Sequence, residues 1–253
     1  EQITWAEDNA VEASPAISAE WSQYQSGTAL RAAESVELSK ETASWDQSAP
    51  FNAMCPMLNG ERTLTGCGAT ATAIIMKYHQ WPDQATDGVT AHPSAAEHPE
   101  WECEPLDYTS GYNWSDEAMP LVVNGEAEVP EIAKLMWHIG ANVDMEYKDG
   151  ASSSSMDDIV LALQDVFGYS HASRAVQKDY YAEDEWEAMI RKEIDADRPV
   201  LYRGRTAADE GHLFVCEGYN SDHYYKINWG WGGSRDNYFL LSALGEEESG
   251  VYN

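Results

Sequence analysis

The chain has 253 residues and a mass of 28.1 kDa, and 43% of its residues are hydrophobic and 11% aromatic. This composition excludes a disordered, collagen-like or coiled-coil protein, and the length fits one large domain or two lobes that share an interface. Lys and Arg number 15 against 44 Asp and Glu, which gives a net charge of -29. Because so acidic a surface repels phosphate backbones and anionic membranes, we expect no nucleic-acid partner.

The N-terminal residues 1–44 are polar and weakly periodic, with one short amphipathic stretch at Ile17–Tyr24. We expect them to form an N-terminal arm or a propeptide remnant, with the main domain at residues 45–253. Residues 1–10 lack the basic and apolar regions of a signal peptide, so we expect either a cytosolic protein or a chain that has lost its leader. The longest apolar stretch, Ala69–Met76, is far shorter than the ~20 residues of a membrane span, so we expect no such span.

Helices precede strands along the chain. The predicted helices are Thr65–Gln80, Pro130–Ile139, Met156–Phe167 and Glu183–Ile194. Residues 82–115 predict a long irregular excursion, and residues 150–155 predict a flexible serine-rich loop. The predicted strands are Pro199–Tyr202, His212–Tyr219, Tyr224–Trp229 and Tyr238–Leu241. This order predicts an α+β fold.

Cys67 is the candidate nucleophile. It lies between Gly66 and Gly68 at the start of the first predicted helix. A helix N-terminus presents free N–H groups and the positive end of the helix dipole, and both favour the thiolate form of a cysteine. The two glycines would let a substrate backbone approach closely. The alternative is a buried structural cysteine, which is a common fate of a free thiol.

His212 is the candidate base for this thiol, because it opens a predicted strand whose partner strand follows a short turn. Counting antiparallel pairs from that turn places His212 opposite Trp229 and Gly230, with Asn228 within reach of the imidazole. A thiol, an imidazole and a residue that orients the imidazole form the cysteine version of a catalytic triad. The sequence leaves open whether Asn228 or Trp229 orients His212.

The chain resembles the streptopain family of secreted bacterial cysteine peptidases, over roughly Trp45 to Leu244. The matching motifs are Thr65–Cys67, Ala69–Ala71, Ile75–His79, Gly211–His212, Phe214–Val215 and Asn228–Gly233. The resemblance implies a papain-like α+β fold of two lobes, in which a helical lobe with the nucleophile helix packs on an antiparallel β-sheet lobe. It also implies a secreted endopeptidase that is made as a zymogen.

The resemblance assigns roles to particular residues. Cys67 would be the nucleophile, and His212 would be the general base and later the acid that protonates the leaving amine. Asn228 and Trp229 occupy the segment that orients the histidine. Gln47 matches a family glutamine that would complete an oxyanion hole with the backbone N–H of Cys67.

The serine-rich segment 152–155 aligns with the substrate-binding loop of the family. Ser153 and Gly211 are therefore the candidates for binding the peptide backbone.

Two departures from the family pattern adjoin these residues. Gly68 stands where the family usually has Val, and Glu210 stands where Gly is common. Glu210 adds negative charge beside the base, which would disfavour acidic substrates, and the acidic chain as a whole favours basic or neutral ones. Cys216 is expected to be structural, and Cys55 and Cys103 could pair, although the sequence does not fix their geometry.

Three functions remain open from the sequence. The first is an active peptidase that acts on protein or peptide substrates, with its own propeptide as a possible inhibitor. The second is an inactive or latent binding module with a peptidase fold. The third is a carbohydrate-binding protein, suggested by 10 Trp and 14 Tyr. No close pair of cysteines or histidines has metal-ligand spacing and no phosphate-binding loop occurs, so we expect neither metal nor other cofactor.

Overall fold

A computed structural model of the chain describes residues 34–86, 101–104, 106–125, 127–206 and 210–244. The amphipathic stretch predicted at Ile17–Tyr24 lies outside these residues. Residues 35–253 cluster as one compact unit, and every element below belongs to it.

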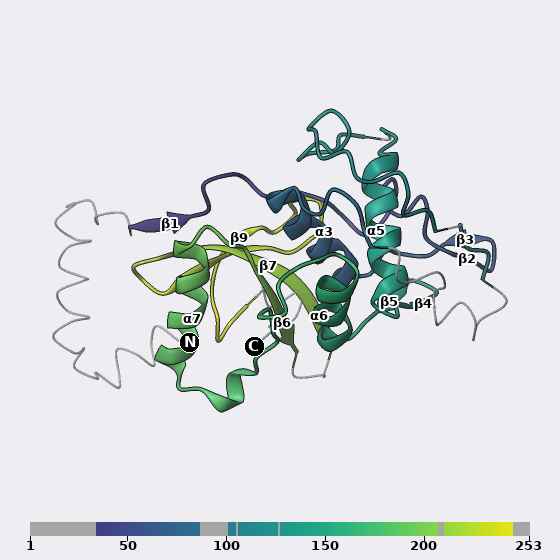
Figure 1. Cartoon of the computed structure of the whole chain (residues 1–253). Helices are drawn as coiled ribbons and strands as arrows, with labels where there is room; N and C mark the ends of the chain where they lie inside the picture. Colours follow the sequence, from purple (N-terminus) through teal and green to yellow (C-terminus); the bar gives the residue numbers. More distant parts are fainter. Residues whose placement is uncertain (1–33, 87–100, 105, 126, 207–209, 245–253) are drawn as a thin grey trace, which may run out of the picture. The chain divides into compact units, whose positions relative to one another are not determined.

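An antiparallel sheet is built around one long strand, β7 (Gly211–Asn220) (Figure 1). One edge of β7 pairs with β8 (Tyr224–Asn228), which in turn pairs with β9 (Asn237–Leu240). The other edge pairs first with β6 (Val200–Arg205) and then with β1 (Ser35–Glu37).

Two apolar cores flank this sheet because its side chains alternate between faces. Leu213 and Val215 belong to a core with the helices α3 (Cys67–His79), α5 (Pro130–Asn142) and α6 (Met156–Asp165). Phe214 and Cys216 belong to a second core with α7 (Glu183–Asp195) and β8. The two cores make a helical lobe and a sheet lobe, as expected.

The central helix is α3, in which every residue from Gly68 to Tyr78 is buried. Its small side chains explain how it can be enclosed on all sides, since Ala and Thr alternate through its first two turns. It packs against α5 and α6 on one side and against β6 and β7 on the other (Figure 1). The first residue of this helix therefore lies where the two lobes meet.

Smaller elements complete the described chain. They are the hairpin of β2 (Met57–Leu58) and β3 (Glu61–Arg62), the hairpin of β4 (Glu146–Lys148) and β5 (Ala151–Ser153), and a 3₁₀ turn at Lys178–Tyr180. In the described residues, no helix is long and apolar enough to span a bilayer.

The four predicted helices and four predicted strands are all present, with ends that differ by up to three residues. The prediction of a flexible loop at residues 150–155 is wrong. Residues 151–153 pair with β4, and the side chain of Ser155 caps α6 by accepting the N–H of Asp158 at 3.0 Å. The buried ring of Tyr147 anchors this hairpin to the helical lobe.

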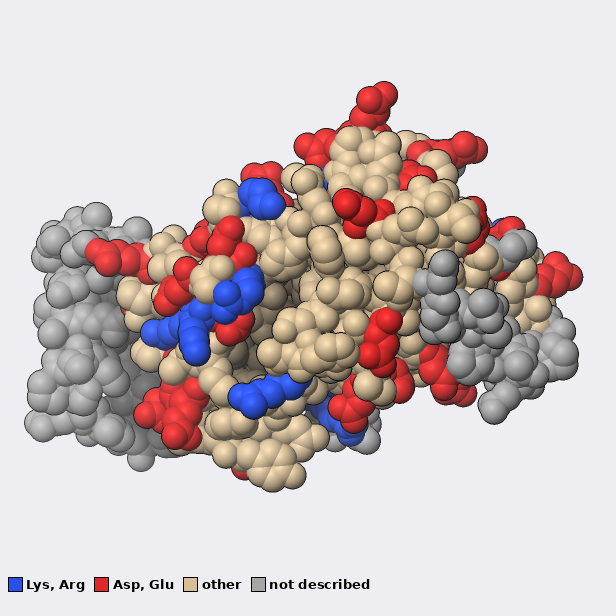
Figure 2. Space-filling model, viewed as in Figure 1, with Lys and Arg blue, Asp and Glu red and all other residues tan. Residues whose placement is uncertain are grey.

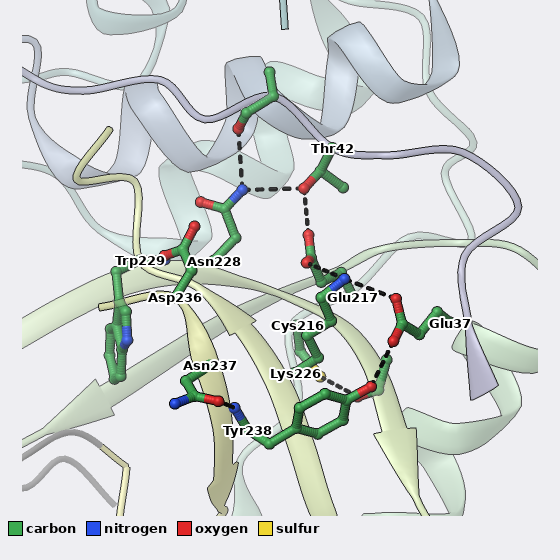
Figure 3. A network of polar contacts seen from close by, with 12 residues as sticks. Glu37, Thr42, Cys216, Glu217, Lys226, Asn228, Trp229, Asp236, Asn237 and Tyr238 are labelled. Carbon is green, nitrogen blue, oxygen red and sulfur yellow. Dashed lines mark hydrogen bonds and ion pairs between the residues drawn. The ribbon is translucent and has the colours of Figure 1, made fainter. Parts of the chain in front are cut away.

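Residues 35–44, the described part of the predicted arm, are part of the sheet lobe. Glu37 accepts hydrogen bonds from Lys226 at 2.7 Å and from Tyr238 at 2.7 Å (Figure 3). Thr42 donates to Glu217, and Ala43 is fully buried. These contacts join residues 35–44 to the compact unit, which begins at Ser35.

Candidate active site

Gly66, the residue before Cys67, has an unusual backbone conformation that places the thiol at the first turn of α3. Gly66 has a φ of 87°, which an L side chain rarely adopts. A Cβ at Gly66 would lie 2.6 Å from Sδ of Met145, so a side chain there would force Met145 to move. Cys67 itself is only partly buried, whereas the residues on both sides of it are buried. The sequence therefore places the thiol at the end of a rigid helix with access from one side.

The surroundings of Cys67 oppose ionisation of the thiol. Burial raises its pKa above the ordinary value, and the nearby backbone of Leu213 and Gly68 lowers it by less. The positive charge of Arg203 also lowers it. The expectation that the helix N-terminus would favour the thiolate is thus outweighed by desolvation. Leu213, which follows His212, packs against the start of this helix, with its Cδ1 3.3 Å from the position of a Cβ on Gly68.

His212 lies near the start of β7, with only 6% of its surface exposed. Its Nε2 donates to the backbone carbonyl of Trp229 at 2.9 Å. Burial lowers the pKa of the imidazole, and the bond to the Trp229 carbonyl raises it by less. The neutral ring therefore carries its proton on Nε2 and a lone pair on Nδ1.

Aromatic rings surround this imidazole. The ring centroid of Trp231 lies 4.8 Å from that of His212, the centroid of Phe214 lies 5.9 Å away and that of Trp229 lies 6.0 Å away. Large apolar rings exclude water and restrict the ring to one orientation. They also account for the desolvation that lowers the pKa of His212.

The predicted register of the hairpin is wrong by one or two residues. A bulge between Cys216 and Gly218 inserts Glu217 into β7, and Asn228 pairs with Val215. If this register continued to His212, the residue opposite it would be Trp231 and not Trp229 or Gly230. The close contact of the His212 and Trp231 rings agrees with this position. Bulges add a residue without a local sequence signal strong enough to fix their position.

Of the two candidates for orienting His212, Trp229 is the one that contacts it. Asn228 points toward Thr42 (Figure 3): its Nδ2 donates to Oγ1 of Thr42 and to the carbonyl of Ala43, both at 3.0 Å. Its Oδ1 accepts the N–H of Gly230 at 3.0 Å. The backbone N–H of Trp229 is itself held by Asp236 Oδ1 at 2.9 Å. The carbonyl that holds His212 is thus fixed by polar contacts on both sides.

Gln47 and Ser153 lie on segments that contact the residues beside Cys67. The backbone carbonyl of Gln47 accepts the N–H of Thr65 at 3.0 Å, which puts Gln47 beside the loop that leads into Cys67. Ser153 is exposed at the end of β5, and the next residue, Ser154, has its Oγ 2.6 Å from the position of a Cβ on Gly68. A larger residue than Gly68 would therefore push this serine away from the site.

Gly211 is exposed at the start of β7, on the other side of His212. The guanidinium of Arg203 lies beside it. Sequence reasoning missed Arg203, although the alternation of the β6–β7 hairpin, in which Arg203 pairs with Leu213, carries the signal. It also missed Thr42 and Asp236, which no local pattern connects to the site.

The other cysteines are separate from this site. All four thiols are free, so Cys55 and Cys103 do not pair: Cys55 is buried and Cys103 is exposed. Cys216 is fully buried in the sheet core, which agrees with a structural role. Among the described residues, no group of three or more His, Cys, Asp or Glu could hold a metal ion.

Comparison with known sequences identifies the family. The sequence profile of the Peptidase C10 family matches residues 45–239. Streptopain from Streptococcus pyogenes is 32% identical over 223 residues, which cover 82% of this chain and 55% of streptopain. Thiol protease/hemagglutinin PrtT from Porphyromonas gingivalis is 32% identical over 222 residues, which cover 83% of this chain and 24% of that protein. The chain therefore spans about half the length of streptopain and less of PrtT.

Two solved structures are similar to this one. The active interpain A cysteine protease from Prevotella intermedia aligns with a TM-score of 0.76 at 28% identity, over 86% of this chain and 91% of interpain A. A fragment of prointerpain A from the same organism aligns with a TM-score of 0.70 at 27% identity, over 87% of this chain and 72% of the fragment. These likenesses confirm the expected papain-like α+β fold. Because the family profile matches most of this sequence, the chain belongs to the Peptidase C10 family.

Proposed function

We propose that the chain is a cysteine endopeptidase that hydrolyses peptide bonds through an acyl-enzyme on Cys67, with His212 as general base and then general acid. The observation that carries this proposal is the packing of Leu213, the neighbour of His212, against the start of the nucleophile helix: its Cδ1 lies 3.3 Å from the position of a Cβ on Gly68, the residue after Cys67. Membership of the Peptidase C10 family and the identity to streptopain support the same activity.

In the acylation step, Sγ of Cys67 attacks the carbonyl carbon of the scissile bond while Nδ1 of His212 accepts the thiol proton. The tetrahedral intermediate then collapses, and the same proton passes from Nδ1 to the leaving amine. A water molecule next attacks the thioester as Nδ1 accepts one of its protons. The acid product leaves, and the proton returns to the thiol.

The negative oxygen of the tetrahedral intermediate needs donors that are already in position. The first N–H groups of a helix have no acceptor within the helix, and Cys67 is the first residue of α3. We infer that its backbone N–H and the side chain of Gln47 form the oxyanion hole. Loss of one such donor costs about 3 kcal/mol of transition-state stabilisation.

Asn228 acts on His212 through the backbone, as a positioning residue. The N–H of Gly230 and the carbonyl of Trp229 belong to one peptide unit, and Asn228 binds the first while His212 binds the second. A hydrogen bond at one end of a peptide unit polarises and orients the other. The contacts of Asn228 with Thr42 and Ala43 hold it in place for this role.

We infer that substrate lies across the thiol between Ser153 of the helical lobe and Gly211 of the sheet lobe. Both are exposed and sit on strand ends, where backbone groups can pair with an extended peptide. We further propose that the protein is secreted and that a propeptide inhibits it, as the likeness to a prointerpain A fragment supports.

The test of the proposed function is labelling with an epoxide inhibitor of cysteine peptidases, analysed by mass spectrometry, together with digestion of casein. We expect one adduct on Cys67 and cleavage of casein. Cys67→Ala removes both, while Cys103→Ser keeps both because Cys103 is an exposed thiol outside the site.

Other outcomes identify the alternatives. An adduct that forms only after removal of residues 1–34 would mean a latent enzyme. No adduct and no cleavage in either form would contradict the proposed activity and favour a binding module with a peptidase fold. Residues 35–44 stay in the shortened chain because they contact the sheet.

A further inference from the structure

Arg203 lies at the border of the site, on the strand next to His212. It pairs with Leu213 across β6 and β7, so their side chains lie on the same face of the sheet. Leu213 belongs to the core of the helical lobe, whereas the flanking residues Tyr202 and Phe214 belong to the other core. Arg203 therefore extends from the face of the sheet that meets the nucleophile helix.

The guanidinium of Arg203 lies over Gly211. Its Nη2 and Nε are 3.2 and 3.4 Å from the position that a Cβ on Gly211 would occupy. The residue is exposed. Its positive charge lowers the pKa of Cys67, although burial outweighs this effect.

Within the described residues, no hydrogen bond or ion pair joins Arg203 to another side chain. This contrasts with Arg191, which pairs with Glu187 at 3.1 Å, and with Arg198, which pairs with Glu193 at 2.6 Å. Among the contacts of the described residues, none therefore occupies the N–H donors of the Arg203 guanidinium, which can bind a carboxylate of another molecule. Figure 2 shows acidic side chains spread over the visible face, while basic ones gather in a few places.

We propose that Arg203 is a specificity-determining residue, which binds the carboxylate of an acidic side chain in the peptide segment lying along Gly211. A guanidinium offers paired N–H donors that match the two oxygens of a carboxylate. The glycine leaves the space in which such a side chain can reach the guanidinium. This proposal depends on the proposed peptidase activity and names part of its substrate.

The overall charge of the chain does not oppose this selection at short range. Repulsion between an acidic surface and an acidic substrate is screened beyond about 8 Å at physiological ionic strength, whereas a direct contact with Arg203 is not. Net charge predicts a preference for basic or neutral substrates. This preference thus applies to the approach of a substrate and not to the substrate side chain that contacts Arg203. Glu210, the residue before Gly211, would weaken the selection by its own negative charge.

The experiment compares fluorogenic peptides in pairs that differ only by Glu or Gln at one position, scanned through the positions on both sides of the scissile bond. The measured quantity is the ratio of kcat/KM for Glu to that for Gln. At one position we expect a ratio of about 10 for the wild-type protein, because a charge-assisted hydrogen bond at a partly exposed site stabilises by about one factor of ten.

Variants show whether Arg203 causes the ratio. Arg203→Gln should bring the ratio to about 1, and Arg203→Glu should invert it, since like charges repel. Glu210→Gln should raise it. Arg198→Gln is the matched control, because this exposed arginine already has a partner, and its ratio should equal that of the wild type. The ratio is measured within one enzyme, so a change in the reactivity of Cys67 cancels.

The contradicting results are separate for the two proposals. Cleavage of the peptides with no position that favours Glu over Gln, or a preference that survives in Arg203→Gln and Arg203→Glu, would overturn the role of Arg203 alone. Failure of the wild-type protein to cleave any peptide or casein would overturn the proposed activity, and the role of Arg203 with it.

Discussion

Cys67 and His212 are held by different kinds of structure. Cys67 begins a helix that apolar side chains enclose, and its position depends on close packing around Gly66. His212 is held by the backbone carbonyl of Trp229. This carbonyl is kept in place because the N–H of Trp229 bonds to Asp236 and the N–H of Gly230 bonds to Asn228. Packing fixes a group through many weak contacts, whereas a polar network fixes it through a few strong ones. The two sides of the site should therefore fail in different ways.

The largest effect is expected on the packed side, from Gly66→Ala. The alanine would have to adopt the φ of 87° that Gly66 has, and its Cβ would lie 2.6 Å from Sδ of Met145. Backbone strain and overpacking together should lower the free energy of unfolding by about 3 kcal/mol, and displacement of the thiol should lower kcat/KM at least ~100-fold. Urea unfolding and peptide hydrolysis measure the two quantities.

Gly60→Ala is the control for this change. Gly60 has a φ of 83°, but nothing lies within 4 Å of its Cβ position. Gly60→Ala therefore introduces similar backbone strain without the clash. It should lower the free energy of unfolding by about 1 kcal/mol and have little effect on activity. Equal losses in the two variants would mean that the contact with Met145 does not position the helix.

On the polar side, Asn228→Ala should leave the protein folded but lower kcat by about 10- to 100-fold, with a smaller change in KM. The Trp229 carbonyl would lose its fixed orientation, and the pKa of His212 in the pH profile would change with it. Asn228→Asp keeps an oxygen for the N–H of Gly230 and should recover part of kcat. If both variants lost stability but kept the kcat and pH profile of the wild type, Asn228 would have a structural role only.

The pH dependence follows from burial of both groups. Because burial lowers the pKa of His212, the imidazole should remain neutral below its usual range, and kcat/KM should fall only below about pH 6.5. Because burial raises the pKa of Cys67, alkylation by iodoacetamide in the free enzyme should increase toward alkaline pH. Fast alkylation that persists to pH 5 would contradict this result and indicate a preformed thiolate–imidazolium pair.

The smallest effect concerns Asp236, whose pKa burial raises to about 6. A carboxyl that binds its proton more tightly in the folded state makes the protein more stable as the pH falls from 7 toward 4. Asp236→Asn keeps an acceptor for the N–H of Trp229 and removes the buried charge. Since the Asp236 carboxyl is partly exposed, we expect the free energy of unfolding of this variant to rise by only about 1 kcal/mol at pH 7.5. Its stability should also depend less on pH, as measured by urea unfolding. A loss of stability at pH 7.5 would mean that the charge itself is needed.

The same contrast explains what the sequence could predict. The start of α3 and the β7–β8 hairpin have local signals, so Cys67 and His212 could be named from the sequence. The orienting group could not, because the bulge at Glu217 changes the register and the partners of Asn228 lie more than 180 residues away. The alternation along β6 and β7 puts Arg203 on the face of Leu213, but it points to the site only once the face that meets α3 is known. The serine-rich β5 was predicted as a loop, since the buried Tyr147 that anchors it lies on the other strand.

The most direct test of the account is to trap the acyl-enzyme. A peptide ester is mixed with the protein, the reaction is stopped with acid within milliseconds to seconds, and the digest is analysed by mass spectrometry. The account predicts the acyl group on Cys67 in the wild-type protein and much slower formation of this adduct in His212→Ala. Hydrolysis of the ester by the wild type with no acyl group on Cys67, or with the acyl group on another residue, would contradict it.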